Sequence, residues 1–591
     1  MSGPDTASAP HAVSVWAPTA TSVDVVVTAD GSEPRTFAAD RNGEWFTAPD
    51  EAAALIDRGA TYAFAVDDES PVPDPRAPWL PAGVHAPGRT FTVDPDLWTD
   101  ADYVGRSVSG AVLYEMHVGT FTEPGTFDAA AERLDHLVEL GVDFVEVMPV
   151  NAVNGDHNWG YDGVGWYAVH EPYGGPAGFA RFVDACHGRG LGVVLDVVYN
   201  HLGPSGNYLP RFGPYLTEAS TGWGQSLNLD EAGSDEVRRY IIDNALRWFD
   251  EFHVDGLRLD AVHALVDRTA VHLLEELATA TDALSARIGR PLSLIAESDL
   301  NDPRMITPRD RGGLGMTAQW DDDVHHAIHT AVSGERQGYY ADFGSLETLS
   351  TVLRRGFFHA MTYSSFRGRR HGRPIDTAAT PATALVVYTC DHDQIGNRAV
   401  GDRPSAYLDH GQLAIKASLV LLSAFTPMLF MGEEWAASTP FQFFTSHPEP
   451  ELGRATAEGR KAEFAAHGWD AAEIPDPQDP ETFRRSKLDW SEVETSGHRD
   501  VLDFYRRLIA LRTEIADFAA GTFASVDTDF DPDARWFALH RGGHTVLCNL
   551  GAEPVTVDIA LEPLLEWHPV STDGPRTTLT GHSVVVGRRL P

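Results

Sequence analysis

The stretch VDGLRLDAVHAL, residues 254–265, has the apolar character of a buried strand but carries an arginine and an aspartate two positions apart. Side chains alternate across a strand, so Arg258 and Asp260 share one face. Ionised side chains are costly to bury unless they are paired. A structural ion pair would explain the two charges, and so would a functional site, because both place charged groups in unusual positions.

Seven further apolar runs of strand length surround this one, and helical stretches separate them. They cover residues 111–118, 142–150, 191–200, 292–298, 315–320, 384–393 and 426–435. Near-continuous apolar strands alternating with helices are typical of a parallel sheet with covered faces. Eight such units predict an α/β fold built on a (β/α)8 TIM barrel with long insertions. An open doubly wound sheet is the structural alternative. No GxGxxG or GxxxxGK[ST] loop follows any of the runs, so a nucleotide-binding function lacks its usual support.

The segments on either side of the predicted barrel have a different pattern of apolar and polar residues. Residues 11–95 hold short alternating segments punctuated by Gly, Pro, Asp and Asn, which predicts a small antiparallel β-sandwich. Strand alternation returns after a predicted helix at 501–515. We therefore expect an N-terminal β-sandwich over residues 1–95, the catalytic barrel over 96–517 and a small C-terminal β-domain over 518–591.

One connecting stretch, TFDAAAERLDHLVELG at residues 126–141, shows the periodicity of an amphipathic helix. Its predicted apolar stripe consists of Leu134, Leu137, Val138 and Leu140. Gly141 is placed where a glycine commonly ends a helix.

The composition narrows the range of partners and compartments. Acidic residues number 86 and basic residues 45, which gives a formal net charge of −41 at pH 7. Nucleic acids and anionic membranes are bound through clustered Lys and Arg, so neither is an expected partner. No signal peptide or run of about 18 apolar residues is visible. Three scattered cysteines fit a reducing compartment, and we expect a cytoplasmic protein.

Polar side chains collect where the predicted strands end. They are Asp196, Asn200, His201, Arg258, Asp260, His263, Glu297, His392 and Asp393. A single acidic residue after a strand is more often a helix cap. Barrel enzymes, however, build their active sites at the carboxyl ends of the strands. Four clusters at one end of the barrel therefore favour a site.

The residue types indicate which chemistry this site would perform. Arg258 beside Asp260 would keep the carboxylate charged, as a carboxylate nucleophile requires. Glu297 follows the apolar run LSLIA, where desolvation would raise its pKa into the range of a general acid. One charged and one protonated carboxyl group, about 5–5.5 Å apart, is the arrangement of a retaining glycosidase. No HExxH, Cys/His cluster or GxSxG motif competes, and we expect no metal and no cofactor.

Four segments resemble the ordered motif regions of the α-amylase superfamily, glycoside hydrolase family 13. They are DVVYNH (196–201), GLRLDAVH (256–263), IAES (295–298) and HDQIGN (392–397). The resemblance implies that Asp260 is the nucleophile, Glu297 the general acid/base and Asp393 the transition-state stabiliser. It also implies substrate contacts from Tyr161, in NWGYDGV (158–164), and from His201, Arg258, His263, His392, Gln394 and Asn397.

Within this superfamily the chain is most similar, over nearly its whole length, to enzymes that act on maltooligosyltrehalose. The segments SDLNDPR (298–304), WDDDVHHAIHT (320–330) and SSFRGRRHGRP (364–374) carry the likeness. It implies hydrolysis, with retention, of the α-1,4 bond between a maltooligosaccharide and its terminal trehalose unit, which releases trehalose. It also implies functional pairing with a maltooligosyltrehalose synthase.

Four residues of the segment after the sixth strand are implied substrate contacts: Asp322, Asp323, His325 and His326. Their alternative role is simply to cap and open a helix. Two positions depart from the family pattern, because Asp321 and Asp391 stand where Asn is usual. A carboxylate at 391 would either raise neighbouring pKa values or face away from the site.

Two other functions stay open. A glucan branching or debranching enzyme of the same superfamily is the nearest alternative, although Gln394 stands where branching relatives tend to carry Glu. A non-catalytic glucan-binding barrel is the other, and it predicts the loss of at least one of the three catalytic carboxylates. All three are present.

Overall fold

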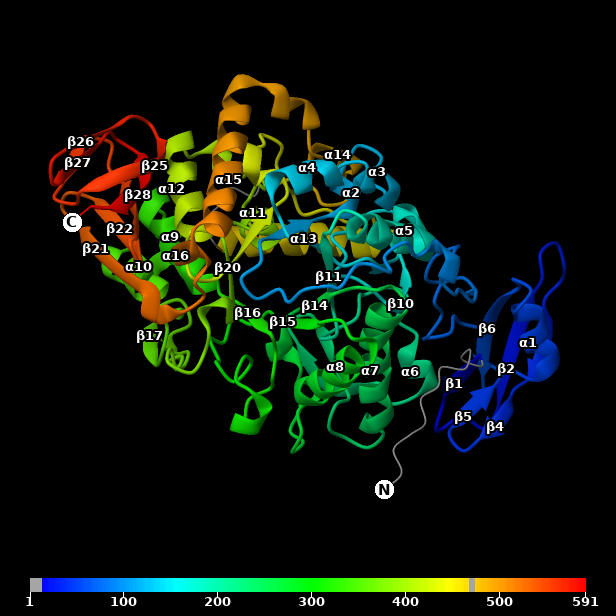
Figure 1. The fold of residues 1–591 in the computed structure, drawn as a ribbon. Coiled ribbons are helices and arrows are strands. Elements are labelled where there is room, and N and C mark those ends of the chain that lie inside the picture. Colours follow the sequence, from blue (N-terminus) through cyan, green and yellow to red (C-terminus); the bar gives the residue numbers. More distant parts are fainter. Residues whose placement is uncertain (1–12, 467–473, 591) are drawn as a thin grey trace.

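The structure is a computed structural model that describes residues 13–466 and 474–590. A closed barrel of eight parallel strands forms its centre (Figure 1). The strands follow one another around the barrel in chain order: β7 (Leu113–Met116), β8 (Phe144–Val147), β11 (Gly192–Val197), β14 (Gly256–Leu259), β15 (Ser293–Ala296), β16 (Ala318–Trp320), β19 (Leu385–Tyr388) and β20 (Thr426–Phe430). Each predicted run supplies one strand, so the barrel prediction is confirmed. The doubly wound alternative is wrong, because β20 pairs with β7 and closes the sheet.

Burial on both faces explains why these strands are nearly continuous apolar runs. Every residue of the eight strands is buried, one face against the outer helices and the other inside the barrel. An apolar cluster that includes Leu113, Phe144, Val194, Ile295, Val386 and Met428 fills the interior. Glu115, Glu146 and Asp196 lie two residues after Leu113, Phe144 and Val194 and therefore face the same interior. Together with Arg258 of β14 they form a charged layer above the apolar cluster.

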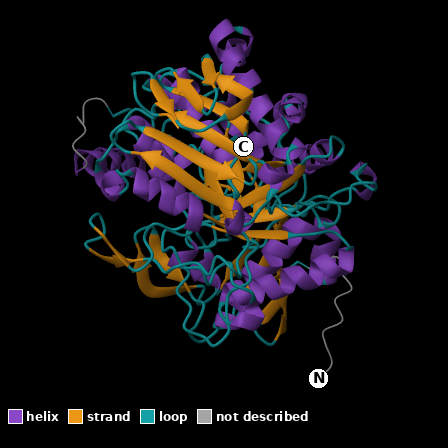
Figure 2. Ribbon diagram, turned by 60° about the vertical axis from the view of Figure 1, so that its left-hand side comes forward, coloured by secondary structure: helices purple, strands orange, loops and turns teal. Residues whose placement is uncertain are grey.

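Helices surround the barrel, as Figure 2 shows. The longer ones among the described residues are α5 (Gly175–His187), α7 (Ser234–Asp250), α8 (Leu273–Ile288), α9 (Asp322–Ser333), α10 (Leu346–Arg355), α12 (His410–Leu421), α13 (Pro450–Ala466) and α15 (Ser496–Glu514). The predicted helix at 501–515 is confirmed as part of α15. Its apolar side chains Leu502, Tyr505 and Leu508 are buried.

The helix predicted over residues 126–141 is broken into α3 (Phe127–Ala131) and α4 (Leu134–Leu140). Gly141 ends α4 with a φ of 94°, as predicted. The place of Val138 in the apolar stripe is wrong, because this side chain is 43% exposed. Leu134, Leu137 and Leu140 define the buried face, and Val138 points about 100° away from Leu137 around the helix.

A β-rich unit stands at each end of the molecule (Figure 1). The N-terminal one pairs β1 (Ser14–Trp16), β4 (Asp40–Asn42) and β5 (Trp45–Thr47) in one sheet. Its second sheet consists of β2 (Val23–Thr28), β3 (Arg35–Ala38) and β6 (Thr61–Val66). The predicted N-terminal β-sandwich is thereby confirmed.

The C-terminal unit also contains two sheets. The larger joins β21 (Val526–Asp531), β22 (Trp536–Arg541), β23 (His544–Asn549), β25 (Leu561–Trp567) and β28 (Ser583–Arg589). The smaller joins β24 (Val555–Val557), β26 (Val570–Asp573) and β27 (Arg576–Leu579). The small C-terminal β-domain is confirmed, whereas the exact domain limits at residues 95 and 517 stay predictions.

Among the described residues, three hairpins are inserted between the barrel elements. They are β9 (Asn151–Ala152) with β10 (Gly165–Val169), β12 (Leu216–Thr221) with β13 (Gly224–Leu227), and β17 (Thr362–Ser364) with β18 (Arg369–His371). Within the described part of the chain, no helix has both the length and the apolar character needed to cross a membrane.

Candidate active site

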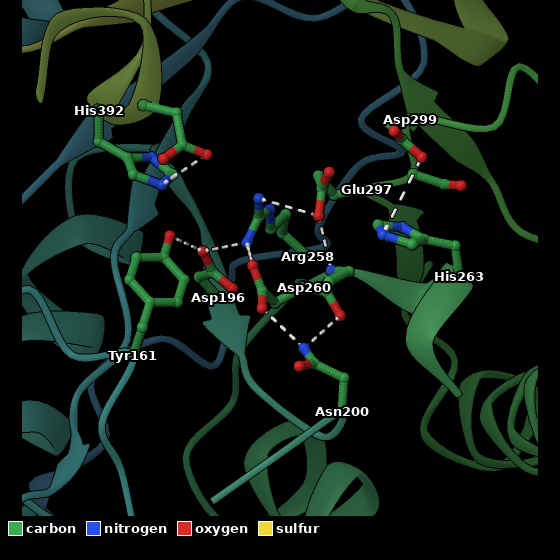
Figure 3. Close-up of polar contacts among 12 residues, drawn as sticks. Tyr161, Asp196, Asn200, Arg258, Asp260, His263, Glu297, Asp299 and His392 are labelled. Carbon is green, nitrogen blue, oxygen red and sulfur yellow. Dashed lines mark hydrogen bonds and ion pairs between the residues drawn. The ribbon is translucent and has the colours of Figure 1, made fainter. Parts of the chain in front are cut away.

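Arg258 organises the carboxyl end of the barrel. Its Nη1 donates hydrogen bonds to Asp196 Oδ2 at 2.8 Å and to Asp260 Oδ1 at 2.7 Å (Figure 3). Its Nη2 lies 3.6 Å from Glu297 Oε2, and its guanidinium stacks 4.4 Å from the centre of the Trp320 ring. Burial alone would lower the pKa of Arg258, but these carboxylates raise it well above its usual value. A buried cation thus lies among three carboxyl groups that come from three neighbouring strands.

Asp260 follows β14 directly, and both of its carboxylate oxygens meet donors. Oδ1 accepts from Arg258, and Oδ2 accepts from Asn200 Nδ2 at 2.7 Å. The same Asn200 nitrogen donates to the backbone carbonyl of Asp260 at 2.9 Å. The shared face and pairing of Arg258 and Asp260 are confirmed. These contacts fix the direction of the carboxylate.

Glu297 lies at the end of β15, close to the same guanidinium. Its Oε2 accepts a hydrogen bond of 2.6 Å from the backbone N–H of Ala261. Ala261 has a φ of 40°, in the left-handed region that non-glycine residues rarely adopt. Burial, assisted by the charge of Asp260 and opposed by that of Arg258, raises the pKa of Glu297 to about 8. The expected rise is confirmed, and Glu297 is protonated at neutral pH.

His392 and Asp393 lie at the start of α11 (His392–Gly396), opposite β7. His392 Nδ1 lies 2.6 Å from Glu115 Oε1, and its backbone N–H donates to Glu115 Oε2 at 3.1 Å. Its Nε2 is 3.6 Å from Asp393 Oδ2. Burial lowers the pKa of His392, but Glu115 and Asp393 raise it to about 10. His392 is therefore an imidazolium, and half-exposed Asp393 stays open to a ligand.

Sequence reasoning missed Glu115. The available signal was one carboxylate in the apolar run AVLYEMHV (111–118). Its partner His392 is 277 residues away, so only the closed barrel reveals the pair.

Tyr161, His201 and Asn397 lie with the catalytic candidates, as predicted. The Tyr161 hydroxyl donates to Asp196 Oδ2 at 2.7 Å, and its ring stacks on His392 at a centroid distance of 5.1 Å. His201 Nδ1 contacts Asn200 Oδ1. Asn397 Nδ2 donates to Asp393 Oδ1 at 3.1 Å.

His263 and Gln394 lie at the margin of this group. His263 Nε2 is 4.0 Å from Asp299 Oδ1, on the far side of Glu297 from Tyr161 (Figure 3). Gln394 Oε1 accepts from the hydroxyls of Tyr339 and Tyr340 at 3.4 and 3.3 Å. Whether either side chain binds substrate stays a prediction.

The four candidates on α9 do not lie together. Asp322 accepts a hydrogen bond from the Tyr388 hydroxyl. It is close enough to Glu297 and Asp393 for electrostatic repulsion, which raises the pKa of Glu297 and that of Asp322 itself. Asp323 Oδ2 instead accepts three hydrogen bonds of 2.8 Å, from Asn301 and from two backbone N–H groups. It therefore holds the segment at Phe358 and His359 in place.

His325 and His326 pack behind Asp322. His325 is 1% exposed, and its ring stacks on His329 and Tyr388. His326 is 8% exposed and stacks on Tyr339. Burial lowers the pKa of both, to about 3 for His326, so both rings are neutral. A direct contact of either ring with substrate stays a prediction.

The two departures from the family pattern are both helix N-caps. Asp391 accepts from the backbone N–H of Gln394 at 2.7 Å at the start of α11. Asp321 accepts from the backbone N–H of Val324 at the start of α9. Asn and Asp are about equally good caps, which explains how one replaces the other. Burial raises the pKa of both carboxyl groups well above the usual value.

The arrangement suits acid–base and nucleophilic work by two carboxyl groups. Asp260 and Glu297 flank one guanidinium, the first held by charged and amide donors and the second protonated. Among residues 13–466 and 474–590, no group of three or more His, Cys, Asp or Glu side chains is placed to hold a metal ion.

Comparison with known proteins places this geometry in a family. Residues 89–219 match the family model of the alpha amylase catalytic domain, and residues 521–586 match a domain of unknown function, DUF3459. The malto-oligosyltrehalose trehalohydrolase of Mycobacterium tuberculosis is 59% identical over 97% of this chain and 98% of its own length. That of Rhizobium sp. (strain M-11) is 57% identical over 92% of this chain and 91% of its own.

Among solved structures, a putative alpha amylase from Salmonella typhimurium matches with a TM-score of 0.86. It is 36% identical and covers 98% of this chain and 97% of its own. A 1,4-alpha-glucan branching enzyme of Xanthomonas campestris is more distant, at 28% identity over 53% of this chain. The chain therefore belongs to the malto-oligosyltrehalose trehalohydrolase family, within the α-amylase superfamily of glycoside hydrolases.

Proposed function

We propose that this protein is a retaining glycosidase that cleaves the α-1,4 bond between a maltooligosaccharide and its terminal trehalose unit. The carrying observation is the pair of carboxyl groups on Arg258: Asp260, held by donors at both oxygens, and Glu297, whose pKa of about 8 keeps it protonated. Family membership supports the substrate, because relatives covering nearly the whole chain carry the name malto-oligosyltrehalose trehalohydrolase.

In the first step, Glu297 gives its proton to the glycosidic oxygen while an Asp260 oxygen attacks the anomeric carbon. The carbon–oxygen bond to trehalose breaks, and a covalent glycosyl–Asp260 ester forms. In the second step, Glu297, now ionised, takes a proton from water, and the resulting hydroxide attacks the same carbon. Asp260 leaves as a carboxylate, and two inversions give net retention.

The charges around the site stabilise the transition states of both steps. Positive charge develops on the sugar ring, and Asp393 presents a half-exposed carboxylate to it. Arg258 balances the negative charge of Asp260 before it attacks and again when it is released from the ester. Tyr161, stacked on His392, presents an aromatic face on which a sugar ring can pack.

The decisive test is product analysis after incubation with maltooligosyltrehalose. Wild type should release free trehalose. Asp260→Asn should abolish turnover, and Glu297→Gln should lower kcat by about 10²–10⁴-fold, the usual contribution of a general acid. Asp310→Asn, at an exposed position, is the matched control and should behave like wild type. Absence of trehalose, or an active Asp260→Asn variant, would refute the proposal.

The branching or debranching alternative is tested in the same experiment. Amylose and branched glucans replace maltooligosyltrehalose as substrates, and the products are sized. New branches, or cleavage of branched glucan faster than maltooligosyltrehalose, would favour that alternative. Gln394 and the lower identity of the branching relative speak against it.

We also propose that this enzyme works in the cytoplasm with a maltooligosyltrehalose synthase that supplies its substrate. The free and buried state of Cys186, Cys390 and Cys548 supports a reducing compartment. Co-incubation of the two enzymes with a maltooligosaccharide should yield trehalose, whereas either enzyme alone should not.

A further inference from the structure

A hollow of about 660 Å³ opens on the surface, between the β9–β10 insertion and the start of α13. Its polar lining comes from His85, Asn154, Glu449, Glu451 and Arg454, and Pro448 and Pro450 add apolar surface. The volume lies within the roughly 300–1,000 Å³ of small-molecule sites. None of these residues takes part in the proposed reaction, so the hollow needs a separate explanation.

The hollow is built by segments that hydrogen bonds hold together. Asn154 Nδ2 donates to Glu449 Oε1 and to Ser205 Oγ, both at 2.9 Å. Ser205 Oγ also donates to Glu449 Oε1 at 2.5 Å, and this contact lowers the pKa of Glu449. His85 Nδ1 lies 2.7 Å from the Tyr208 hydroxyl. His85, Asn154 and Glu449 are therefore held in place before any ligand arrives, which reduces the ordering cost of binding.

The same segments lead directly into the catalytic centre. Asn154 lies in the β9–β10 insertion that carries Tyr161, and Ser205 lies four residues after His201. The segment before Glu449 reaches the Tyr161 loop as well, because His447 Nε2 is 3.9 Å from Asp162 Oδ2. Short segments of chain thus join the lining of the hollow to the loops that carry Tyr161 and His201.

Chemistry identifies which part of a substrate lies on that side. Glu297 gives its proton to the oxygen of the leaving sugar, so the released part lies on the Glu297 side of Asp260. In Figure 3, Asp299 and His263 lie beyond Glu297, whereas Tyr161 and His392 lie on the opposite side of Arg258. The chain that stays bound to Asp260 therefore extends towards Tyr161, the side from which the hollow is reached.

We propose that the hollow is a binding subsite for glucose units of the maltooligosyl chain remote from the scissile bond. Arg454 can donate, whereas Glu449 and the amide oxygen of Asn154 can accept, a mixture that suits the hydroxyl groups of a neutral sugar. The prolines can pack against the apolar face of a glucose ring. An anionic ligand fits less well, because Glu449 and Glu451 would repel it. The inference rests on the proposed function for its direction along the chain.

Chain-length dependence tests this subsite. Arg454, exposed on α13, is replaced by Ala, and kcat/KM is measured for maltosyltrehalose and maltohexaosyltrehalose. The ratio of long to short should fall about tenfold, as expected for one lost charge-assisted hydrogen bond. Lys461→Ala, two turns further along α13 and exposed, is the matched control and should leave the ratio unchanged. An unchanged ratio in Arg454→Ala would overturn the proposal.

A binding measurement separates this inference from the proposed function. Calorimetric titration with maltohexaose should give a Kd about tenfold higher for Arg454→Ala than for wild type or Lys461→Ala. Such a difference in a protein that releases no trehalose would refute the proposed function but support the subsite. Trehalose release together with equal Kd values would refute the subsite alone.

Discussion

Glu297 and Asp260 touch the same guanidinium, and their different surroundings give them different roles. Glu297 receives one backbone N–H and is otherwise desolvated, whereas Asp260 receives a hydrogen bond from Arg258 Nη1 and another from the Asn200 amide. Pairs of carboxyl groups whose environments differ in this way identify acid and nucleophile. The different roles of Glu297 and Asp260 thus depend on the donors around each carboxyl group, because the two groups are chemically alike.

The pH dependence of turnover should follow Glu297. Only its protonated form can donate to the leaving oxygen, so kcat/KM should fall as pH rises through about 8, tenfold per unit. The check is the pH profile of trehalose release. A glycosyl fluoride, whose leaving group needs little protonation, should lack this limb. A limb of equal size with both substrates would contradict the assignment of Glu297.

Glu115 should control the charge of His392. In Glu115→Gln the pKa of His392 falls from about 10 towards its usual value, so the ring becomes neutral at a lower pH. We expect kcat/KM to lose roughly tenfold by pH 8, with the loss growing from neutral pH upward. An NMR titration of His392 reports the pKa directly. Unchanged titration and an unchanged profile would exclude this role for Glu115.

At the scale of secondary-structure elements, N-caps connect helix geometry to the site. Asp391 starts the helix that carries His392 and Asp393, and Asp321 starts the helix that carries Asp322. Both caps are buried carboxyl groups with raised pKa values. These caps therefore position active-site residues at a cost in stability that depends on pH.

Replacing either cap with Asn should change stability in a pH-dependent way. A pKa raised in the folded state means that the wild-type contribution is complete at low pH and is lost as pH rises through the folded value. Asp391→Asn and Asp321→Asn, which keep the cap, should therefore exceed wild type in Tm by a margin that grows with pH. Activity should change by less than about threefold, since Asn caps as well as Asp.

Asp409 provides the opposite control. It caps α12, and hydrogen bonds from the Gln412 backbone and from His582 outweigh burial and lower its pKa. Its contribution is present above the unfolded pKa and lost as pH falls. Asp409→Asn should therefore be less stable than wild type at neutral pH and converge with it in acid. A margin with the same sign for all three variants would contradict this account.

The barrel strands were predictable, whereas an inserted hairpin and several contacts of the site were not. Strands that are buried on both faces must be largely apolar, so runs such as LGVVLDVVYN (191–200) can be recognised as strands in the sequence. The β12–β13 hairpin is only partly buried, and its short strands lack such a signal. Asp260, Glu297 and Asp393 followed from strand ends, whereas the hydrogen bonds of Asp323 to residues 358–359 depend on tertiary contacts.

On the scale of the whole molecule, the net charge of −41 is the dominant electrostatic feature. Self-repulsion of this size destabilises a compact state while it favours solubility. The chain contains only three lysines, Lys416, Lys461 and Lys487, and Arg supplies the remaining cations. Many exposed arginines pair locally with carboxylates, as Arg268 does with Asp230, but the excess of acid stays unbalanced.

Added salt should therefore stabilise the folded protein. The screening length falls from about 10 Å at 0.1 M to about 3 Å at 1 M, so repulsion between exposed carboxylates weakens. We expect Tm to rise with NaCl, most steeply below about 0.3 M. Thermal unfolding across a NaCl series measures this. A flat or falling Tm would show that the acidic surface costs the fold little.

The buried Arg258 guanidinium also has a consequence for how activity is acquired during folding. It joins Asp196, Asp260 and Glu297, which lie on three consecutive strands separated by long helical crossovers. No single βα unit contains the acid and the nucleophile in their final geometry. During folding, catalytic activity therefore appears late and in a single step, after the non-local pairing of the barrel strands, which is intrinsically slow. On refolding, enzymatic turnover should return after the circular dichroism signal of the helices. The time at which activity returns would therefore report the closure of the barrel.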